Sequence, residues 1–326
     1  MQTREVARAT VRVVIEEMPT KAAPLAAREI APPRRLGLVL HPRHDLVESL
    51  DVVSRWAASA GVALVGRDDE RLPPTVQRRT YARLARSCDV VLALGGDGTF
   101  LTALRIAAPH RVPVLGANLG DVGYLTEVCG DRLLEALEAL VAGSFAIEER
   151  FALTAKWRAH DRERERVAYN DLVLSRVPRH GQARLGLSVD GQLLVRYASD
   201  GVIVATPLGS TGYSFAAGGP MVSPQTRALV VTPDAPHGLF NRSVVLGHDE
   251  RLDIEVLPSS APVTLEIDGH LVARATPGSL VEVAPAAVPA LVVRLGAPGF
   301  AERARRKLLI SDAAALGGPG LFRQAV

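Results

Sequence analysis

The chain has 326 residues, of which 48% are hydrophobic and 22% charged, and its formal net charge is +3. This length suits one large domain or two ordinary ones, and the apolar content excludes global disorder. No apolar run reaches the roughly 18 residues that can span a bilayer. The segment DRERER at Asp161–Arg166 alternates arginine with acidic residues, which indicates a solvated edge or turn. We therefore expect neither a membrane nor a nucleic acid as a partner.

Two cysteines, Cys88 and Cys129, are present, and they form no CxxC pair. A zinc site or a redox motif is therefore not expected. A reducing, cytoplasmic setting fits this cysteine usage best.

The first half of the chain alternates apolar runs with amphipathic stretches, after an Ala- and Pro-rich extension or linker at residues 1–34. Short apolar runs between turn signals predict buried strands, and apolar residues at helical spacing predict helices. The expected strands are 35–42, 62–66, 89–96 and 112–118, and the expected helices are 45–61, 74–87, 99–108 and 131–144. Strands that alternate with helices form a parallel sheet covered on both faces. Residues 35–145 are therefore predicted to be a Rossmann-like parallel α/β domain.

The pattern changes at Phe151, where short β-patterned runs begin, separated by turn signals such as DG, PSS and PG. The expected strands lie within 151–160, 165–176, 183–197, 200–206, 242–247, 251–257, 263–274 and 279–286. Residues 146–290 are therefore predicted to be an all-β, sandwich-like domain. Residues 291–326 follow as a C-terminal segment with a basic helical stretch at 297–309.

A single aspartate, Asp97, stands between glycines in the sequence GGDGT, at the end of a predicted buried strand. Nucleotides bind at glycine-rich turns of this kind in open α/β sheets, and the N-terminus of the next helix favours phosphate. The turn is neither a GxGxxG motif nor a P-loop, because it lacks the Lys-Ser/Thr pair. Asp97 would repel phosphate, so it needs a function of its own, such as gripping a hydroxyl group or a magnesium ion. The alternative is a tight turn in which Asp97 only caps the helix.

A second glycine-rich loop occurs in SDGVIVATPLGSTGYS, which runs from Ser199 to Ser214. The hydroxyl groups of Ser210, Thr211 and Ser214 offer hydrogen bonds, and Tyr213 offers a flat face for a base. Taken by itself, the loop could equally be a sandwich connection that carries no chemistry.

The GGDGT sequence resembles the motif of a kinase superfamily that contains NAD kinases, diacylglycerol-type lipid kinases and phosphofructokinases. Further matches occur in family order, and they resemble NAD kinases in particular: GANLGDVGYL, AYNDLVL, TPLGSTGY, PDAPHGLFNR and EIDGHL. Lipid kinases share only the GGDGT motif. On these motifs the chain is similar to the NAD kinase family from about Arg35 to the C-terminal helix.

This resemblance implies an α/β domain, a β-sandwich-like domain and a terminal segment that packs back on the first domain. It implies transfer of the terminal phosphoryl group of ATP, or of inorganic polyphosphate, to the 2′-hydroxyl of the adenosine ribose of NAD, which gives NADP. Magnesium or another divalent cation would assist. It also implies a homo-oligomer, a dimer or tetramer, in which a neighbouring subunit completes the NAD site.

The resemblance also implies roles for individual residues. Asp97 would be the catalytic residue that orients the ribose hydroxyl and accepts its proton. The donor phosphates are expected at Gly95, Gly96, Gly98 and Thr99. NAD is expected to contact Asp97, Gly98, Tyr124, Asn170, Asp171, Asp200, Thr211, Gly212, Tyr213 and Ser214. Among these, Asn170 and Asp171 would meet the adenine edge or the ribose, and Asp200 the nicotinamide end. No metal ligand is assigned.

Several positions depart from the family pattern, namely Ala198, Leu208, Gly212, Ala216 and Asp121. Ala198 and Asp121 stand where basic residues occur in family members, so positive charge near a phosphate-rich ligand is lost. These departures leave open a diverged paralogue that phosphorylates another small hydroxyl-bearing metabolite. A non-catalytic NAD(P)-binding regulator is a third interpretation, which the intact GGDGT motif disfavours. The donor, ATP or polyphosphate, and the acceptor, NAD or NADH, both stay open at this stage.

Overall fold

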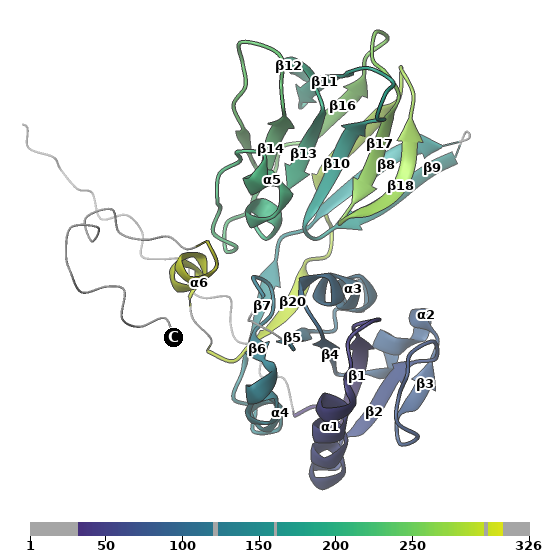
Figure 1. Ribbon diagram of the computed structural model, residues 1–326, viewed down its shortest axis with the longest axis vertical. Helices are drawn as coiled ribbons and strands as arrows, with labels where there is room; N and C mark the ends of the chain where they lie inside the picture. The colour runs from purple at the N-terminus through teal and green to yellow at the C-terminus, as the bar shows by residue number, and fades with distance from the viewer. Residues whose placement is uncertain (1–31, 120–122, 160–161, 297–298, 309–326) are drawn as a thin grey trace, which may run out of the picture.

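The computed structural model describes residues 32–119, 123–159, 162–296 and 299–308, which form one mixed α/β unit and one β-sandwich (Figure 1). Most of the 1–34 extension, the departure at Asp121 and the end of the C-terminal segment lie outside the described residues. No helix within the described ranges is both long and apolar enough to cross a bilayer.

An eight-stranded sheet forms the centre of the α/β unit within the described residues. Along the sheet the strands run in the order β3 (Gln77–Arg79), β2 (Ala63–Arg67), β1 (Arg35–Leu40), β4 (Val90–Leu94), β5 (Val114–Asn118), β20 (Ala290–Arg294) and β7 (Ala146–Arg150). The short β6 (Val128–Cys129) also pairs with β5. All these pairings are parallel except that of β7 with β20. The predicted parallel sheet is confirmed, and its strands include the four expected from the sequence.

Helices cover both faces of this sheet because successive strand residues point to opposite sides. In β1, Leu36, Leu38 and Leu40 pack in the same core as α1 (Val47–Ala60) and α4 (Leu133–Val141). Val39 points the other way, into the core of α2 (Tyr81–Leu84) and α3 (Asp97–Ala107). Each strand is therefore apolar on both faces, as the unbroken hydrophobic runs in the sequence predict.

The β-sandwich consists of two six-stranded antiparallel sheets. One has the order β15 (Val244–Gly247), β14 (Ala228–Asp234), β13 (Gly201–Ala205), β10 (Asp171–Arg176), β17 (Val263–Ile267) and β18 (His270–Ala275). The other has the order β12 (Gln192–Ser199), β11 (Ala183–Val189), β16 (Leu252–Val256), β19 (Leu280–Pro285), β8 (Leu153–Ala159) and β9 (Arg162–Ala168). Alternating residues such as Leu172, Leu174, Val202, Leu185 and Ile254 fill the space between the sheets.

The chain passes between the two units after β7 and before β20, and these two strands pair side by side in the first sheet (Figure 1). The first sheet continues past the expected boundary at 145/146, because β7, which spans Ala146–Arg150, pairs within it. β20 returns beside β5, and α6 (Phe300–Lys307) follows it. The terminal segment thus begins as a strand of the first sheet.

The predicted helix at 74–87 is wrong in its first half. Residues Gln77–Arg79 form β3, which pairs with β2 at the edge of the sheet, and only Tyr81–Leu84 and a 3-10 turn at Ala85–Ser87 are helical. An open sheet edge offers unpaired backbone groups, and pairing with them outweighs a weak helical preference. The sequence analysis also missed β14, which pairs with its chain neighbours β13 and β15, and β20, whose partners β5 and β7 are distant in the sequence.

Candidate functional site

The GGDGT turn joins β4 to α3, and Asp97 is the first residue of that helix. Gly95 has φ of 152°, in the region that favours glycine, and its N–H donates to the carbonyl of Ala117. A Cβ at Gly95 would lie 2.5 Å from Thr99 Oγ1, so no larger residue fits. At Gly96 and Gly98 a Cβ would meet no atom within 4 Å. The turn is therefore closely packed at Gly95. It is open at Gly96 and Gly98, at the start of the helix, where an anion is favoured.

Thr99, which was expected to contact a donor phosphate, is buried on this helix. Its Oγ1 has no hydrogen-bond partner among the described residues. The side chain therefore sits against Gly95 with its hydroxyl hydrogen-bonding capacity unused by the described part of the protein.

The Asp97 carboxylate is held by the backbone of the segment that follows β5. The N–H of Tyr124 donates to Asp97 Oδ2 at 3.0 Å, and the N–H of Leu125 donates to Oδ1 at 3.1 Å. A Cβ at Gly123 would lie 2.1 Å from Oδ1, so glycine is required beside the carboxylate. Asp97 is thus more than a helix cap, because its carboxylate fixes the loop around Tyr124.

Asn170 immediately precedes β10 and Asp171 is its first residue, and a third polar residue, Asp268, holds them in place. The Asp268 carboxylate accepts N–H groups from Tyr169, Asn170 and Asp171 at distances of 2.7–3.2 Å. Its own N–H donates to the carbonyl of Asp171 at 2.9 Å. Hydrogen bonds to a charged group each contribute about 1.5–3 kcal/mol, so this carboxylate fixes the backbone at the Asn170-Asp171 pair.

Burial, followed by the negative charge of Asp268, raises the pKa of Asp171 from its ordinary value of 3.8 to about 7. The side-chain amide of Asn170 donates to Asp171 Oδ2 at 3.1 Å and partly opposes this shift. Burial raises the pKa of Asp268 as well, but three N–H donors and Arg105 favour its ionised form. The pKa of Asp171 is therefore raised to near neutrality, whereas its neighbours oppose the shift of Asp268.

The Thr206–Tyr213 loop packs directly against Asn170. The N–H of Thr206 donates to the Asn170 carbonyl at 2.9 Å, and a Cβ at Gly209 would lie only 2.0 Å from the same oxygen. A Cβ at Gly212 would lie 3.3 Å from Asn170 Nδ2, so glycine here, where the family has alanine, leaves more room beside that amide. The structure brings Asn170, Asp171, Thr211 and Gly212 together at one end of β10 and β13.

Leu208, another departure from the family pattern, is 9% exposed and packs with Phe100 and Tyr169 in the α3 core. Leucine at this position, where the family has threonine, therefore adds apolar contact between the two units. Tyr124 lies nearby, and its hydroxyl donates to Met221 Sδ at 3.6 Å.

Ser214, Tyr213 and Asp200 make contacts within the sandwich. The Ser214 hydroxyl is buried and shares a hydrogen bond with Thr232 at 2.9 Å. The Tyr213 hydroxyl donates to Asp234 Oδ2 at 2.9 Å. Asp200 pairs with Arg176 at 2.5 Å, at the opposite end of β13 from the Thr206 loop. The structure therefore separates Asp200 from the Asn170-Asp171 pair within one chain.

Sequence analysis missed Arg105 and the role of Asp268. Arg105 lies two turns after Asp97 on α3, and its Nε is 3.6 Å from Asp268 Oδ2, whose side chain is fully buried. Its Nη2 also donates to the Asp268 carbonyl at 3.4 Å. One helix therefore connects the Asp97 carboxylate to the Asn170-Asp171 pair of the other unit. The EIDG turn signalled Asp268, but no local pattern signalled its partner.

The described residues contain no group of three or more His, Cys, Asp or Glu side chains that could hold a metal ion. Mg²⁺ in phosphoryl-transfer sites is bound by one or two carboxylates together with substrate phosphates. Asp97 fits that pattern, because each of its oxygens accepts a single N–H and retains a free lone pair.

The parallel sheet with GGDGT at the start of α3 is the arrangement of a GGDGT-motif kinase. Residues 37–145 match the ATP-NAD kinase N-terminal domain family, and residues 169–295 match the ATP-NAD kinase C-terminal domain family. The chain therefore belongs to the ATP-NAD kinase family, and the expectation of a kinase that acts on NAD is confirmed.

Relatives agree with this assignment. NAD kinase 1 of Streptomyces avermitilis is 37% identical over 318 residues, which cover 86% of this chain and 88% of the relative. The NAD kinase of Symbiobacterium thermophilum is 43% identical over 222 residues, 68% of this chain and 78% of the relative.

The fold is similar to that of yeast NADH kinase in complex with NADH, with a TM-score of 0.77 and 23% identity over 86% of this chain and 89% of that one. It is also similar to an NAD kinase from Archaeoglobus fulgidus in complex with ATP, with a TM-score of 0.66 and 22% identity over 84% and 97% of the two chains.

The raised pKa of Asp171 predicts a pH-dependent stability. Because the folded-state pKa lies above the ordinary value, the contribution of this carboxyl is full below about pH 4 and is lost as the pH rises through 7. We expect the melting temperature of Asp171→Asn, measured relative to the wild type, to be several degrees higher at pH 8 than at pH 5. Differential scanning fluorimetry at both values measures this, with Asp51→Asn on the exposed face of α1 as the control. The same difference in melting temperature between variant and wild type at both pH values would contradict the prediction.

The contact between Arg105 and Asp268 predicts a positioning role for Arg105. Replacement by methionine keeps most of the volume but removes the cation, so Asn170 and Asp171 lose their alignment with Asp97. We expect kcat/KM for NAD to fall about 10- to 100-fold, the cost of a small misplacement, with the KM for ATP unchanged within a factor of about three. Steady-state kinetics test this, and Arg86→Met, an exposed arginine of the same unit, is the matched control. Normal kcat/KM in a folded Arg105→Met protein would show that the ion pair only stabilises the fold.

Proposed function

We propose that Asp97 activates the 2′-hydroxyl of the adenosine ribose of NAD for attack on the terminal phosphorus of ATP. The oxygen–phosphorus bond forms as the bond to ADP breaks, and Asp97 takes the hydroxyl proton. The observation that carries this assignment is the carboxylate held by two backbone N–H groups at the first residue of α3. Because the carboxylate is already fixed before the substrate binds, it can position a hydroxyl without a further loss of side-chain conformational entropy.

The donor phosphates are assigned to the start of α3. Gly96 and Gly98 leave open space there, and the positive end of the helix dipole favours phosphate. Magnesium, when bound with the donor, would neutralise phosphate charge in the transition state. Asp97 is the residue with carboxylate oxygens available to such an ion beside the phosphates.

The adenosine end of NAD is assigned to Asn170, Asp171, Thr211 and Gly212, which lie together against the Asp268 turn. Tyr124 is proposed to pack against the base. Asp200 and Tyr213 are assigned to the nicotinamide end of NAD bound to a neighbouring subunit, since Asp200 lies at the far end of β13. Both cysteines are free thiols, which supports a cytoplasmic setting.

Asp97→Asn tests the central assignment. The amide has nearly the same size but no basicity, so kcat should fall by about 10² to 10⁴, the usual contribution of a positioned proton acceptor. NADP formation from NAD, ATP and magnesium is the measurement, with NADH, polyphosphate and other hydroxyl compounds as alternative substrates. Because the amide also alters the contact with Leu125 or Tyr124, the melting temperature and the NAD affinity are measured on the same sample. Near-normal turnover with weakened NAD binding would make Asp97 a substrate ligand only.

Self-association is proposed through the edge of the sandwich formed by β12 and β15. Exposed apolar side chains gather on these strands and the loop before β15, namely Leu193, Leu194, Leu239, Phe240 and Val245. Apolar edge strands of this kind pair with another chain or lie in an interface.

Val245→Arg should therefore dissociate a dimer or tetramer, since a charge would be buried without a partner. Multi-angle light scattering measures the mass. Leu271→Arg, equally exposed on β18 at the opposite edge, should keep the wild-type mass. A monomeric wild-type protein with full activity would refute the proposal.

A further inference from the structure

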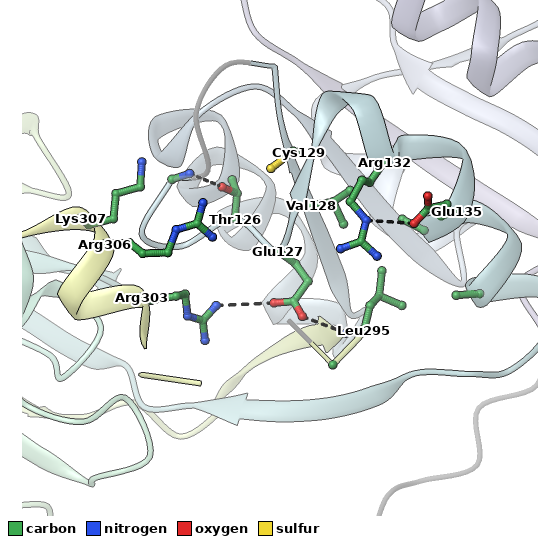
Figure 2. Close-up of a pocket in the computed structure, with 14 residues that line it drawn as sticks. Thr126, Glu127, Val128, Cys129, Arg132, Glu135, Leu295, Arg303, Arg306 and Lys307 are labelled. Carbon is green, nitrogen blue, oxygen red and sulfur yellow. Dashed lines mark hydrogen bonds and ion pairs between the residues drawn. The ribbon is translucent and has the colours of Figure 1, made fainter. Parts of the chain in front are cut away.

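A cavity of about 490 Å³ lies in the α/β unit, and none of the residues assigned to NAD lines it (Figure 2). Its walls are the β6 segment with Thr126 and Cys129, the start of α4, and one face of α6. This volume falls within the range of small-molecule sites, roughly 300–1,000 Å³. No lining residue comes from the 151–290 region, which carries Asn170, Asp171 and the Thr206–Tyr213 loop.

The cavity is rich in positive charge. Arg303, Arg306 and Lys307 line it from one face of α6, at the i, i+3, i+4 spacing that places side chains together, and Arg132 faces them (Figure 2). Arg132 is paired with Glu135 at 2.9 Å. In the described part of the chain, no ion pair involves Arg306 or Lys307. Two cations of α6 therefore face the cavity without a carboxylate partner there.

One buried carboxylate, Glu127, lies in the wall, and arginines surround it. It pairs with Arg294 and lies 3.5 Å from Arg303, and it accepts the N–H of Leu295 at 2.9 Å. Burial and the nearby charge of Arg294 lower the pKa of Arg303. Arg294 is also paired with Glu148 at 3.1 Å, and Glu148 as well as Glu127 acts on Arg303. The positive charge in excess therefore comes from Arg306 and Lys307, which a further anion would neutralise.

The cavity lies next to the Asp97 carboxylate, with Gly123 between them. This glycine lines the cavity, and a Cβ on it would touch Asp97 Oδ1. The cavity therefore borders the loop that holds the Asp97 carboxylate, and neither Asn170 nor Asp171 lines it. An in-line phosphoryl transfer needs donor and acceptor on opposite sides of the transferred group.

We propose that this cavity binds the part of the phosphoryl donor's anionic phosphate chain that lies beyond the phosphates at the start of α3, the chemistry that a nucleoside triphosphate and inorganic polyphosphate share. Arg306 and Lys307 contact the end of the chain remote from Asp97, and Arg132 contacts its middle. The proposal rests on the kinase function and on the assignment of Asp97 given above. It assigns to α6 a role in donor binding that the sequence motifs do not indicate.

Cys129 provides a direct readout of occupancy. It is half-buried and lines the cavity, whereas Cys88 is buried, donates to the Leu84 carbonyl, and has its pKa raised by burial to about 12. A thiol reagent such as N-ethylmaleimide should therefore label Cys129 in the native protein. Tripolyphosphate and ATP should each slow this labelling at least fivefold, and NAD alone should leave the rate unchanged.

The second test uses charge reversal on α6. Arg306→Glu and Lys307→Glu should each raise the KM for the donor at least tenfold and abolish protection of Cys129, with the KM for NAD unchanged within about twofold. Arg305→Glu is the matched control, because it carries the same charge change on the same helix but lies outside the cavity lining. The KM is measured with ATP and with polyphosphate, because either donor could supply the phosphate chain. Equal effects on both KM values place the shared phosphates in the cavity. An effect on the KM for polyphosphate alone makes the cavity a site for that donor.

Three results would overturn the proposal while leaving the kinase function intact. Labelling of Cys129 could be blocked by NAD but not by tripolyphosphate, which would place the acceptor in the cavity. Arg305→Glu could raise the KM for the donor as much as Arg306→Glu does, which would reflect net charge alone. Normal donor KM in folded Arg306→Glu and Lys307→Glu proteins would remove the cavity from the reaction. Absence of NADP formation by the wild type would instead count against the kinase function itself.

Discussion

The buried Asp268 carboxylate receives N–H groups from three consecutive residues and faces Arg105 of α3. A charge buried this deeply is tolerated only when donors and a cation surround it. Because the donors belong to the β-sandwich and the cation to the α/β unit, satisfying one carboxylate fixes how the two units meet. The relative placement of Asp97 and the Asn170-Asp171 pair depends on this contact.

The same helix has a second constraint at its start. Gly95 and Gly123 are in contact with Thr99 and Asp97, at distances that exclude any side chain. The position of the Asp97 carboxylate is therefore set by close contact with the backbone and by two N–H donors. This rigidity suits phosphoryl transfer, in which catalysis consists mainly of positioning and charge stabilisation.

In the proposed reaction the two units have different roles. The sandwich supplies the Asn170-Asp171 pair and the loop packed on it, and the α/β unit with α6 supplies the basic cavity. β20 and β7 pair in one sheet, so the chain enters and leaves the sandwich at adjacent points. This double crossing brings α6, from the end of the described chain, beside β6 and α4.

Sequence by itself determined the local features: the buried strands β1, β2, β4 and β5, the helices α1, α3, α4 and α6, the hairpins at the DG turns, and the GGDGT turn with its family. These follow from periodicity, glycine positions and short motifs, which are local properties. Only the tertiary structure decided the pairing of Gln77–Arg79 as an edge strand and the return of Ala290–Arg294 to the first sheet. It alone decided the use of the Ser214 hydroxyl inside the sandwich, the raised pKa of Asp171 and the contact of Arg105 with Asp268. Each of these depends on groups far apart in the chain, whose distance and burial no local pattern encodes.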